Sequence, residues 1–139
     1  MTSPVVRAKT SYNLFVYGSL RDKALFQSVC GYCFEFSPRP RAGNNILRAE
    51  SGSILGYTII SPDRRYPYAM TASGDSIEGL MIHAVPVTAF SLIDRYEGCY
   101  YQRENVIVHT AGRKKRQAQA YLANKDLLQK DFGDRFDMP

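Results

Sequence analysis

The sequence predicts an α+β fold built as one small domain, and three observations lead to this class. The chain of 139 residues has the length of a single domain. Short strand-like runs are interspersed irregularly with two or three short helical stretches, unlike the regular strand–helix alternation of a parallel-sheet protein. The last two strand-like runs are separated by a short turn, which predicts an antiparallel hairpin.

The N-terminal part of the chain predicts a strand, a helix and a second strand. Residues 12–17 are an aromatic and β-branched run that ends at Gly18, as expected for a largely buried strand. Residues 21–29 lack Gly and Pro, carry apolar residues at helical spacing and precede Gly31, which predicts a short helix. Residues 32–36 then return to a strand-like pattern.

The middle of the chain predicts a loop and two strands. Residues 37–53 are rich in Pro, Gly, Asn and Arg, so a long loop is expected there. Residues 54–60 and 76–85 are strand-like, and the turn-forming residues 73–75 lie between them. The run DRRYPY at residues 63–68 fits either a plain turn or a cap over a pocket, and the sequence leaves both open.

The C-terminal part predicts a helix and the closing hairpin. Pro86 suits the first turn of a helix that runs to Glu97 and is closed by Gly98. Residues 102–109 and 117–122 are strand-like and are joined by a turn, so they are expected to pair with each other.

These elements divide the chain into three expected parts. Residues 1–11 are polar and unpatterned, and they predict a flexible N-terminal arm. Residues 12–122 hold the predicted strands and helices and form the domain. Residues 123–139 predict a polar C-terminal tail with one or two helical turns.

Composition and charge restrict the class of protein. Hydrophobic residues make up 45% and charged residues 22%, which is typical of a globular domain and excludes wholesale disorder. The formal net charge is +5, and four positive charges lie in the single run Arg113 to Arg116. Because no aromatic residues interrupt this run, a solvated turn is expected, and nucleic-acid binding through it is the weaker alternative. The sequence shows neither a secretion signal nor an apolar stretch of membrane-spanning length, so we expect a cytoplasmic protein that does not contact membranes.

The cysteines predict neither a redox centre nor a metal site. Cys30 and Cys33 have the spacing of a redox dithiol, but they lie at the end of a predicted helix, whereas the helix dipole acidifies a thiol at the start. With Cys99 their number is odd, which fits a reducing compartment. Neither His83 nor His109 has ligand spacing to them, so we expect inert cysteines and no bound metal.

A candidate binding loop follows the first strand. In the run Tyr17-Gly18-Ser19-Leu20, a strand turns into a helix, and successive backbone N–H groups there can receive an anion or an oxyanion. Gly18 permits a ligand to approach the backbone closely. A simple tight turn explains the same pattern, and the residues alone leave both interpretations open. Ser19 lacks the G-x-S-x-G context of a serine nucleophile.

Glu97 is the candidate general base. On the predicted helix it shares a face with the apolar residues Phe90 and Ile93, with Asp94 at the edge of that face. Burial on this face and the negative end of the helix dipole both raise the pKa of a carboxyl group towards neutrality. The alternative is a frayed last turn that leaves Glu97 in water. Glu78 is the competing glutamate, but alternation along its strand predicts that it faces solvent.

Four motifs in order along residues 12–122 resemble the γ-glutamylcyclotransferase-like family. The similarity is closest to its small members, which include γ-glutamylamine cyclotransferases and the plant avirulence-induced relatives. The family pattern has a Tyr-Gly-Ser/Thr-Leu loop, a strand with a glycine, a Leu/Ile-Asp-x-Tyr/Phe-Glu segment and a Tyr-x-Arg strand. The matching segments here are Tyr17 to Leu20, Glu78 to Ile82, Ile93 to Glu97 and Tyr101 to Arg103.

The resemblance implies a fold, a reaction and a set of site residues. The fold is a compact mixed β-barrel flanked by short helices, with a pocket at one end. The loop from Tyr17 to Leu20 binds the γ-glutamyl part of the substrate, Tyr101 and Arg103 complete the binding site, and Glu97 is the general acid/base. The α-amine of a γ-glutamyl group attacks its own γ-carbonyl, which yields 5-oxoproline and a free amine or amino acid without a metal or cofactor.

The resemblance is weaker in the region that shapes the pocket for the leaving amine. Residues 66–69 follow the Tyr-Pro-Ala motif of the small members only in part. The sequence therefore predicts the class of reaction but not the identity of the leaving amine. The alternative function is a non-catalytic binding or regulatory domain that keeps the pocket for an amino-acid-like ligand.

Overall fold

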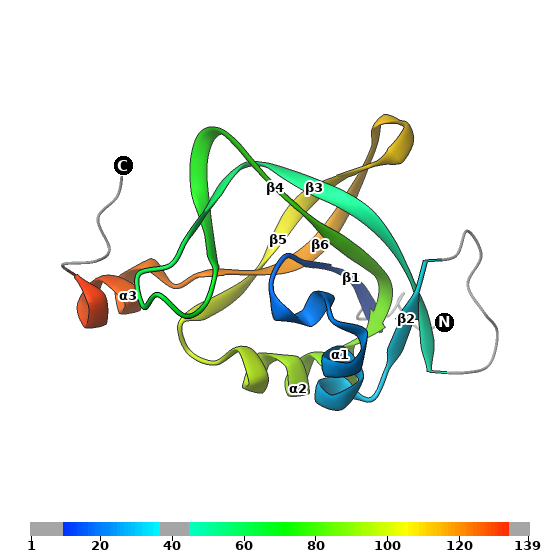
Figure 1. The fold of residues 1–139 in the computed structure, drawn as a ribbon. Coiled ribbons are helices and arrows are strands. Elements are labelled where there is room, and N and C mark those ends of the chain that lie inside the picture. Colours follow the sequence, from blue (N-terminus) through cyan, green and yellow to red (C-terminus); the bar gives the residue numbers. More distant parts are fainter. Residues whose placement is uncertain (1–9, 37–44, 134–139) are drawn as a thin grey trace, which may run out of the picture.

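The structure, a computed structural model, describes residues 10–36 and 45–133 and confirms the predicted α+β class. Six strands and three α-helices are joined by short 3-10 turns in the described part (Figure 1). The strands are β1 (Ser11–Val16), β2 (Cys33–Glu35), β3 (Ile46–Ile60), β4 (Tyr68–Pro86), β5 (Tyr101–Thr110) and β6 (Lys114–Ala123). The helices are α1 (Lys23–Cys30), α2 (Val87–Glu97) and α3 (Lys125–Phe132), and the 3-10 turns are η1 (Ser19–Arg21) and η2 (Ala111–Arg113).

The strands form one sheet that curls into a partial ring. β3 with β4 and β5 with β6 are antiparallel neighbours, and a short β3–β5 pairing joins the two hairpins on one side. On the other side β1 pairs antiparallel with β4 and parallel with β6. In the order β1-β4-β6-β5-β3-β2, the added β4–β3 pairing closes β4, β6, β5 and β3 into a ring, and β1 pairs with both β4 and β6.

Alternation along β1 divides the core between the two faces of the sheet. Leu14 and Val16 point to the side covered by α1 and α2, whereas Phe15 points to the inside of the ring. The helix side is filled by buried residues that include Phe26, Phe34, Ile82, Phe90 and Ile93. The inside of the ring is filled by Ile54, Ile77, Met81, Val106 and Val108, among others.

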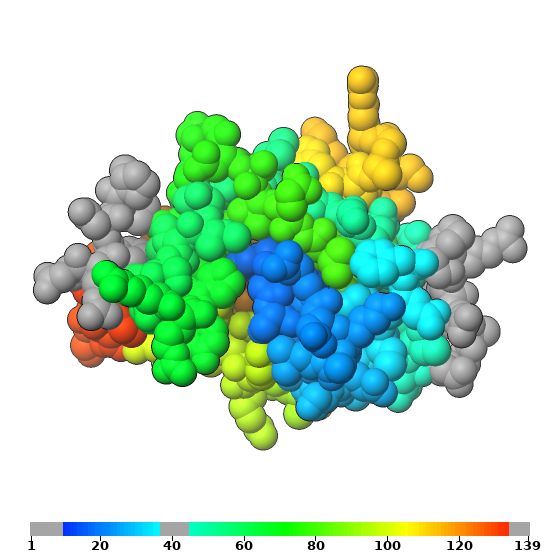
Figure 2. All heavy atoms as spheres, in the orientation of Figure 1, coloured from blue at the N-terminus to red at the C-terminus, as the bar shows by residue number. Residues whose placement is uncertain are grey.

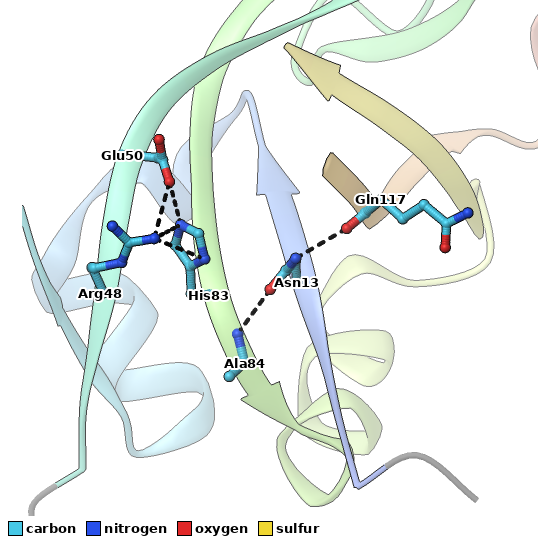
Figure 3. Close-up of polar contacts among 6 residues, drawn as sticks. All are labelled: Asn13, Arg48, Glu50, His83, Ala84 and Gln117. Atoms are coloured by element: carbon cyan, nitrogen blue, oxygen red, sulfur yellow. Dashed lines mark hydrogen bonds and ion pairs between the residues drawn. The ribbon is translucent and has the colours of Figure 1, made fainter. Parts of the chain in front are cut away.

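The structure corrects the predicted loop over residues 37–53, because β3 already begins at Ile46. The first part of that prediction, residues 37–44, lies outside the described residues. Charged residues made this segment look like a loop, but their side chains find partners on the sheet. The Arg48 guanidinium lies 3.3 Å from the Glu50 carboxylate and 2.9 Å from the Nε2 atom of His83 on β4, which also contacts Glu50 (Figure 3). Cross-strand pairing of this kind stabilises a polar strand.

The turn predicted at residues 73–75 is also wrong, because these residues lie within β4. The connection between β3 and β4 is formed by residues 61–67 instead. Gly56 and Gly74 have positive φ angles of 83° and 89°, and the β3–β4 register shifts beside Gly56. A glycine bulge therefore bends the long hairpin where the composition indicated a turn.

The other predicted elements are present, with small differences at their ends. Pro86 is the residue before α2, and Gly98 ends the helix with a φ angle of 82°. Asn13 secures the irregular β1–β4 pairing, because its side chain accepts a hydrogen bond from the Ala84 N–H and donates one to the Gln117 carbonyl oxygen (Figure 3). The predicted tail contains α3, whose Leu128 is fully buried. The division of the chain into arm, domain and tail stays a prediction.

Within the described residues, the helices are all too short to cross a lipid bilayer.

Candidate active site

The loop after β1 is held in place by Tyr17. The Tyr17 hydroxyl donates to the Tyr121 carbonyl oxygen on β6 and accepts the Ala69 N–H of β4 at 3.0 Å. Burial raises the pKa of this phenol, and the nearby carboxylate of Glu97 raises it further. The hydroxyl of Tyr17 therefore fixes the end of β1 between two strands, and its ring forms part of a cavity wall.

The next three residues form the floor of that cavity. Gly18 lies against the β3–β4 connection, since a Cβ atom on it would stand 3.2 Å from Pro67 Cγ. Leu20 is buried in the core beneath the helices, which anchors η1. The N–H groups of Gly18, Ser19 and Leu20 precede the first hydrogen bond of η1, so their partners must come from outside that helix. The Ser19 hydroxyl lies 2.9 Å from the Tyr96 hydroxyl on α2.

Glu97 is the last residue of α2 and lines the same cavity as the loop. Phe90 and Ile93, on the same face of the helix, are buried in the core and fix the direction of this face. Glu97 itself is half-buried, and desolvation raises the pKa of its carboxyl group from 4.5 to about 7. At neutral pH the group can therefore both accept and donate a proton.

Two neighbouring cavities meet at Glu97. The inner one is small, about 30 Å³, and it is lined by residues 15–20 together with Pro67, Glu97, Tyr101 and Tyr121. The outer one is larger, about 420 Å³, and lies between the β3–β4 connection, the end of α2 and α3. Glu97 and Tyr101 belong to both linings, so a ligand occupying both cavities passes the carboxyl group. Figure 2 shows the surface hollowed where the blue start of the domain, the green β3–β4 connection and the yellow-green end of α2 meet.

Tyr101 forms the wall between the two cavities. Its hydroxyl donates to the Pro67 carbonyl oxygen at 2.6 Å, and its ring stacks on that of Tyr68 with centroids 4.6 Å apart. The Tyr68 hydroxyl in turn donates to Asp63 at 2.6 Å. These contacts tie β5 to the β3–β4 connection, so this connection is both a turn and part of the cavity lining.

Arg103 lies outside the linings of both cavities. Its guanidinium stands 3.2 Å from the Asp94 carboxylate on α2 and covers the ring of Phe90 at 4.6 Å. Asp94 also accepts a hydrogen bond of 2.6 Å from the Tyr121 hydroxyl. The three residues Arg103, Asp94 and Tyr121 thus join β5, α2 and β6 one turn before Glu97 and hold the end of α2. Arg103 and Asp94 lie outside both linings, whereas Tyr121 also lines the inner cavity.

Removing the Tyr121 hydroxyl tests the role of this support. Because Tyr121→Phe deletes one hydrogen bond to a partly exposed carboxylate, we expect the free energy of unfolding to fall by about 1 kcal/mol. Thermal denaturation should show a melting temperature lower by about 4 °C. The matched control is Tyr96→Phe, because the hydroxyl of Tyr96 has the exposed Ser19 as its partner and its loss should leave the melting temperature unchanged. Equal melting temperatures for wild type and Tyr121→Phe would contradict the supporting role.

The remaining candidates from the sequence lie away from the cavities. Cys30 is buried at the end of α1, burial raises the pKa of its thiol, and Cys33 is also unpaired. The basic run is exposed as expected, but only Arg113 lies in the turn, because Lys114 to Arg116 begin β6 and pair with β5. Glu78 faces solvent on β4. Among the described residues, no three side chains of the types that hold a metal ion gather together.

Three residues of the linings carry no motif in the sequence. Tyr100, Tyr121 and Phe132 lie on different segments, and each becomes part of the site through strand pairing or helix packing. The run DRRYPY at residues 63–68, which fitted a turn or a cap over a pocket, supplies four residues to the outer lining. The high tyrosine content, 10 residues, does not indicate which tyrosines take part.

Comparison with solved structures shows the same fold. Two Arabidopsis thaliana proteins solved in solution superpose with TM-scores of 0.66 and 0.64 at 20% and 19% identity. The alignments cover 86% and 94% of this chain, and 66% and 91% of those proteins. A solved gamma-glutamyl cyclotransferase superposes with a TM-score of 0.63 at 14% identity, covering 88% of this chain and 80% of that one.

The sequence itself matches a family model. No curated protein matches it. The model described as "Gamma-glutamyl cyclotransferase, AIG2-like" matches residues 14–137, which takes in the loop after β1, α2 and β5. The chain therefore belongs to the gamma-glutamyl cyclotransferase, AIG2-like family.

Proposed function

We propose that this protein releases 5-oxoproline from a small γ-glutamyl compound, with Glu97 as general acid/base. The observation that carries this proposal is the position of Glu97. Its carboxyl group lies where the two cavities meet, beside the loop of residues 17–20, and desolvation raises its pKa to about 7. A carboxyl group with this pKa suits proton transfer in both directions at neutral pH.

The inner cavity suits the charged end of a γ-glutamyl group. It is small, and the N–H groups of Gly18, Ser19 and Leu20 lie along its lining segment. Backbone N–H groups bind a carboxylate or stabilise a developing oxyanion. The scissile amide then lies beside Glu97, and the leaving amine extends into the outer cavity.

The reaction needs one proton acceptor that later becomes a donor. Glu97 accepts a proton from the α-amine while the amine nitrogen forms a bond to the γ-carbonyl carbon. Glu97 then returns this proton to the leaving nitrogen, the original carbon–nitrogen bond breaks, and 5-oxoproline and the free amine result. Nucleophile and electrophile belong to one molecule, so holding the substrate folded supplies most of the advantage of proximity.

Release of 5-oxoproline from a panel of γ-glutamyl amino acids and amines tests this function. We expect turnover, with kcat/KM falling as the pH drops below about 7 because Glu97 must be ionised to accept the proton. Thermal stabilisation by these compounds without any 5-oxoproline would contradict the enzymatic proposal and would favour a non-catalytic binding domain of the same fold. Turnover with the same kcat/KM on both sides of that pH would contradict the role of Glu97.

A further inference from the structure

The outer cavity is walled mainly by aromatic rings. Four tyrosines and a phenylalanine line it, each on a different segment. They are Tyr66 in the β3–β4 connection, Tyr68 at the start of β4, Tyr96 on α2, Tyr100 between α2 and β5, and Phe132 at the end of α3. Tyr101 completes the wall on the side of the inner cavity. The volume of the outer cavity, about 420 Å³, falls in the range of small-molecule sites.

Most of the tyrosine hydroxyl groups in this wall are already engaged within the protein. The hydroxyls of Tyr68 and Tyr100 donate to Asp63 and Asp131, both at 2.6 Å. The Tyr101 hydroxyl donates to a backbone carbonyl oxygen, as described above. What these residues offer a ligand is therefore the faces and edges of their rings, which favour another flat ring.

The carboxylate in the cavity wall is engaged as well. One Asp63 oxygen accepts the N–H groups of Arg65 and Tyr66, at 2.9 and 3.0 Å, and the other accepts the Tyr68 hydroxyl. Partial burial raises the pKa of Asp63, but these hydrogen bonds and the nearby positive charge of Arg65 favour the ionised form, so the pKa lies below its ordinary value. Asp63 thus builds the connection between β3 and β4 and has little hydrogen-bonding capacity left for a cationic ligand.

Arg65 is the positively charged group of the wall, and it lies near enough to Asp63 to help lower the pKa of that carboxyl group. Its guanidinium lies over the ring of Tyr66, 5.6 Å from the centroid. Within residues 10–36 and 45–133, no carboxylate oxygen lies within ion-pair distance of this guanidinium. A guanidinium at an aromatic wall binds a carboxylate through two parallel hydrogen bonds.

The C-terminal helix completes the cavity in this chain. Phe132 of α3 packs against Tyr100 with ring centroids 5.5 Å apart, and Asp131 receives the Tyr100 hydroxyl. Leu128 is fully buried, so the helix is fixed to the end of the sheet. Figure 1 places α3 beside the β3–β4 connection, and both supply residues to the lining.

We propose that the outer cavity is a subsite for an aromatic amino acid as the leaving group, with its ring among the tyrosines and its carboxylate on Arg65. This inference rests on the proposed function, because it assigns the part of the substrate that departs. The preferred substrates are then γ-glutamyl derivatives of phenylalanine or tyrosine. Derivatives whose leaving amine carries a positive charge and no carboxylate, such as γ-glutamylcadaverine, are disfavoured because Arg65 repels them and three hydrogen bonds already engage Asp63.

The kinetic test compares four substrates that differ in the leaving group. We expect kcat/KM for γ-glutamylphenylalanine to exceed that for γ-glutamylalanine and for the cationic γ-glutamylcadaverine by about tenfold or more. γ-Glutamylphenethylamine has the ring without the carboxylate and should be intermediate. In Arg65→Gln, kcat/KM for γ-glutamylphenylalanine should fall to the value for γ-glutamylphenethylamine. The value for γ-glutamylphenethylamine itself should not change. Equal kcat/KM for the phenylalanine and alanine derivatives, or a preference for γ-glutamylcadaverine, would overturn the inference.

Arg64→Gln is the matched control, because Arg64 is the neighbouring arginine and lies outside the lining of the outer cavity. It should keep the wild-type substrate order. The aromatic wall is tested with Tyr66→Leu, a change at a half-exposed side chain that should reduce the preference for phenylalanine over alanine without unfolding the protein. An unchanged preference in this variant would count against the ring contacts.

A binding measurement separates this inference from the proposed function. Free phenylalanine, the expected product, should raise the melting temperature of the wild type more than alanine or lysine does, and this effect should disappear in Arg65→Gln. If no substrate yields 5-oxoproline but this selectivity is present, the proposed reaction is wrong and the aromatic subsite stands. If 5-oxoproline forms without any such selectivity, the subsite is wrong and the reaction stands.

Discussion

Glu97→Gln is expected to lower the rate of 5-oxoproline release by about 10²–10⁴-fold, the usual contribution of a general acid/base. Glutamine keeps the shape of the side chain and its place at the junction of the cavities but neither accepts nor returns a proton at neutral pH. The loss should appear in kcat, because the inner cavity and the outer cavity keep their linings. Initial rates at saturating substrate, measured near neutral pH, provide the test.

The control for this variant is Glu78→Gln. Glu78 is exposed on β4, so the substitution removes the same charge without touching either cavity. It should keep the wild-type rate. A Glu97→Gln protein as active as the wild type would exclude Glu97 as the proton carrier, whatever the reaction.

The same substitution is expected to stabilise the protein at alkaline pH. The pKa of Glu97 is raised from 4.5 to about 7, so between these values the folded state binds more protons than the unfolded state. The free energy of unfolding of the wild type therefore decreases as the pH rises through this window and levels off above it. Glu97→Gln lacks this loss and should be the more stable protein at about pH 8, by an amount on the order of 2 kcal/mol.

Denaturant unfolding of both proteins at about pH 5 and about pH 8 measures this effect. The difference in unfolding free energy should be small at the lower pH and clear at the higher. A variant that is less stable than the wild type at about pH 8 would mean that the ionised carboxyl group is compensated rather than desolvated. Greater stability combined with lost activity is typical of a strained catalytic group.

Gly79→Ala is expected to cause the largest loss of stability. A Cβ atom at this position would lie 2.3 Å from the Val16 carbonyl oxygen and 2.8 Å from the Phe15 ring. Both neighbours belong to β1, which is paired with β4 at this point, so neither can give way without displacing the strand. We expect a cost of about 4 kcal/mol or more, with a melting temperature lower by about 10 °C or more.

The effect of Gly79→Ala should extend to the site, because Val16 directly precedes the loop of residues 17–20. Circular dichroism during heating measures the loss of stability. Ser76→Ala on the exposed side of the same strand is the control, and it should stay within about 0.5 kcal/mol of the wild type. A Gly79→Ala protein with an unchanged melting temperature would show that β1 can move away from β4 at little cost.

The elements that could be predicted from the sequence are those determined by residues close together in the chain. Gly31 and Gly98 end α1 and α2 with positive φ angles, a conformation that the residue type itself permits, and both helix ends were predicted. The start of β3 was missed because its polar composition resembled that of a loop. In the folded chain the side chains of Arg48 and Glu50 contact His83 on the neighbouring strand. The signal for that partner lies 33 residues away from Glu50 along the chain.

The candidate site divides in the same way. Periodicity placed Glu97 on the apolar face of its helix, and the Gly-Ser turn marked the loop after β1. Neither pattern placed these two segments together, and the run DRRYPY left open whether its tyrosines line a pocket. The predicted substrate-binding role of Arg103 stays a prediction, and the structure places its guanidinium beside Asp94 of α2, outside the linings of both cavities.

By itself, the sequence determined the α+β class, the family, the ends of the helices and the two motifs that carry the proposed chemistry. These depend on the conformational preferences of neighbouring residues, which act over one or two turns of chain. The tertiary structure alone decided that Glu97 lies beside the loop of residues 17–20, that Arg103 supports a helix, and that Arg65 and the tyrosines share one cavity. Those arrangements follow from strand register and from the packing of the two core faces, where the contacts join residues far apart in the chain.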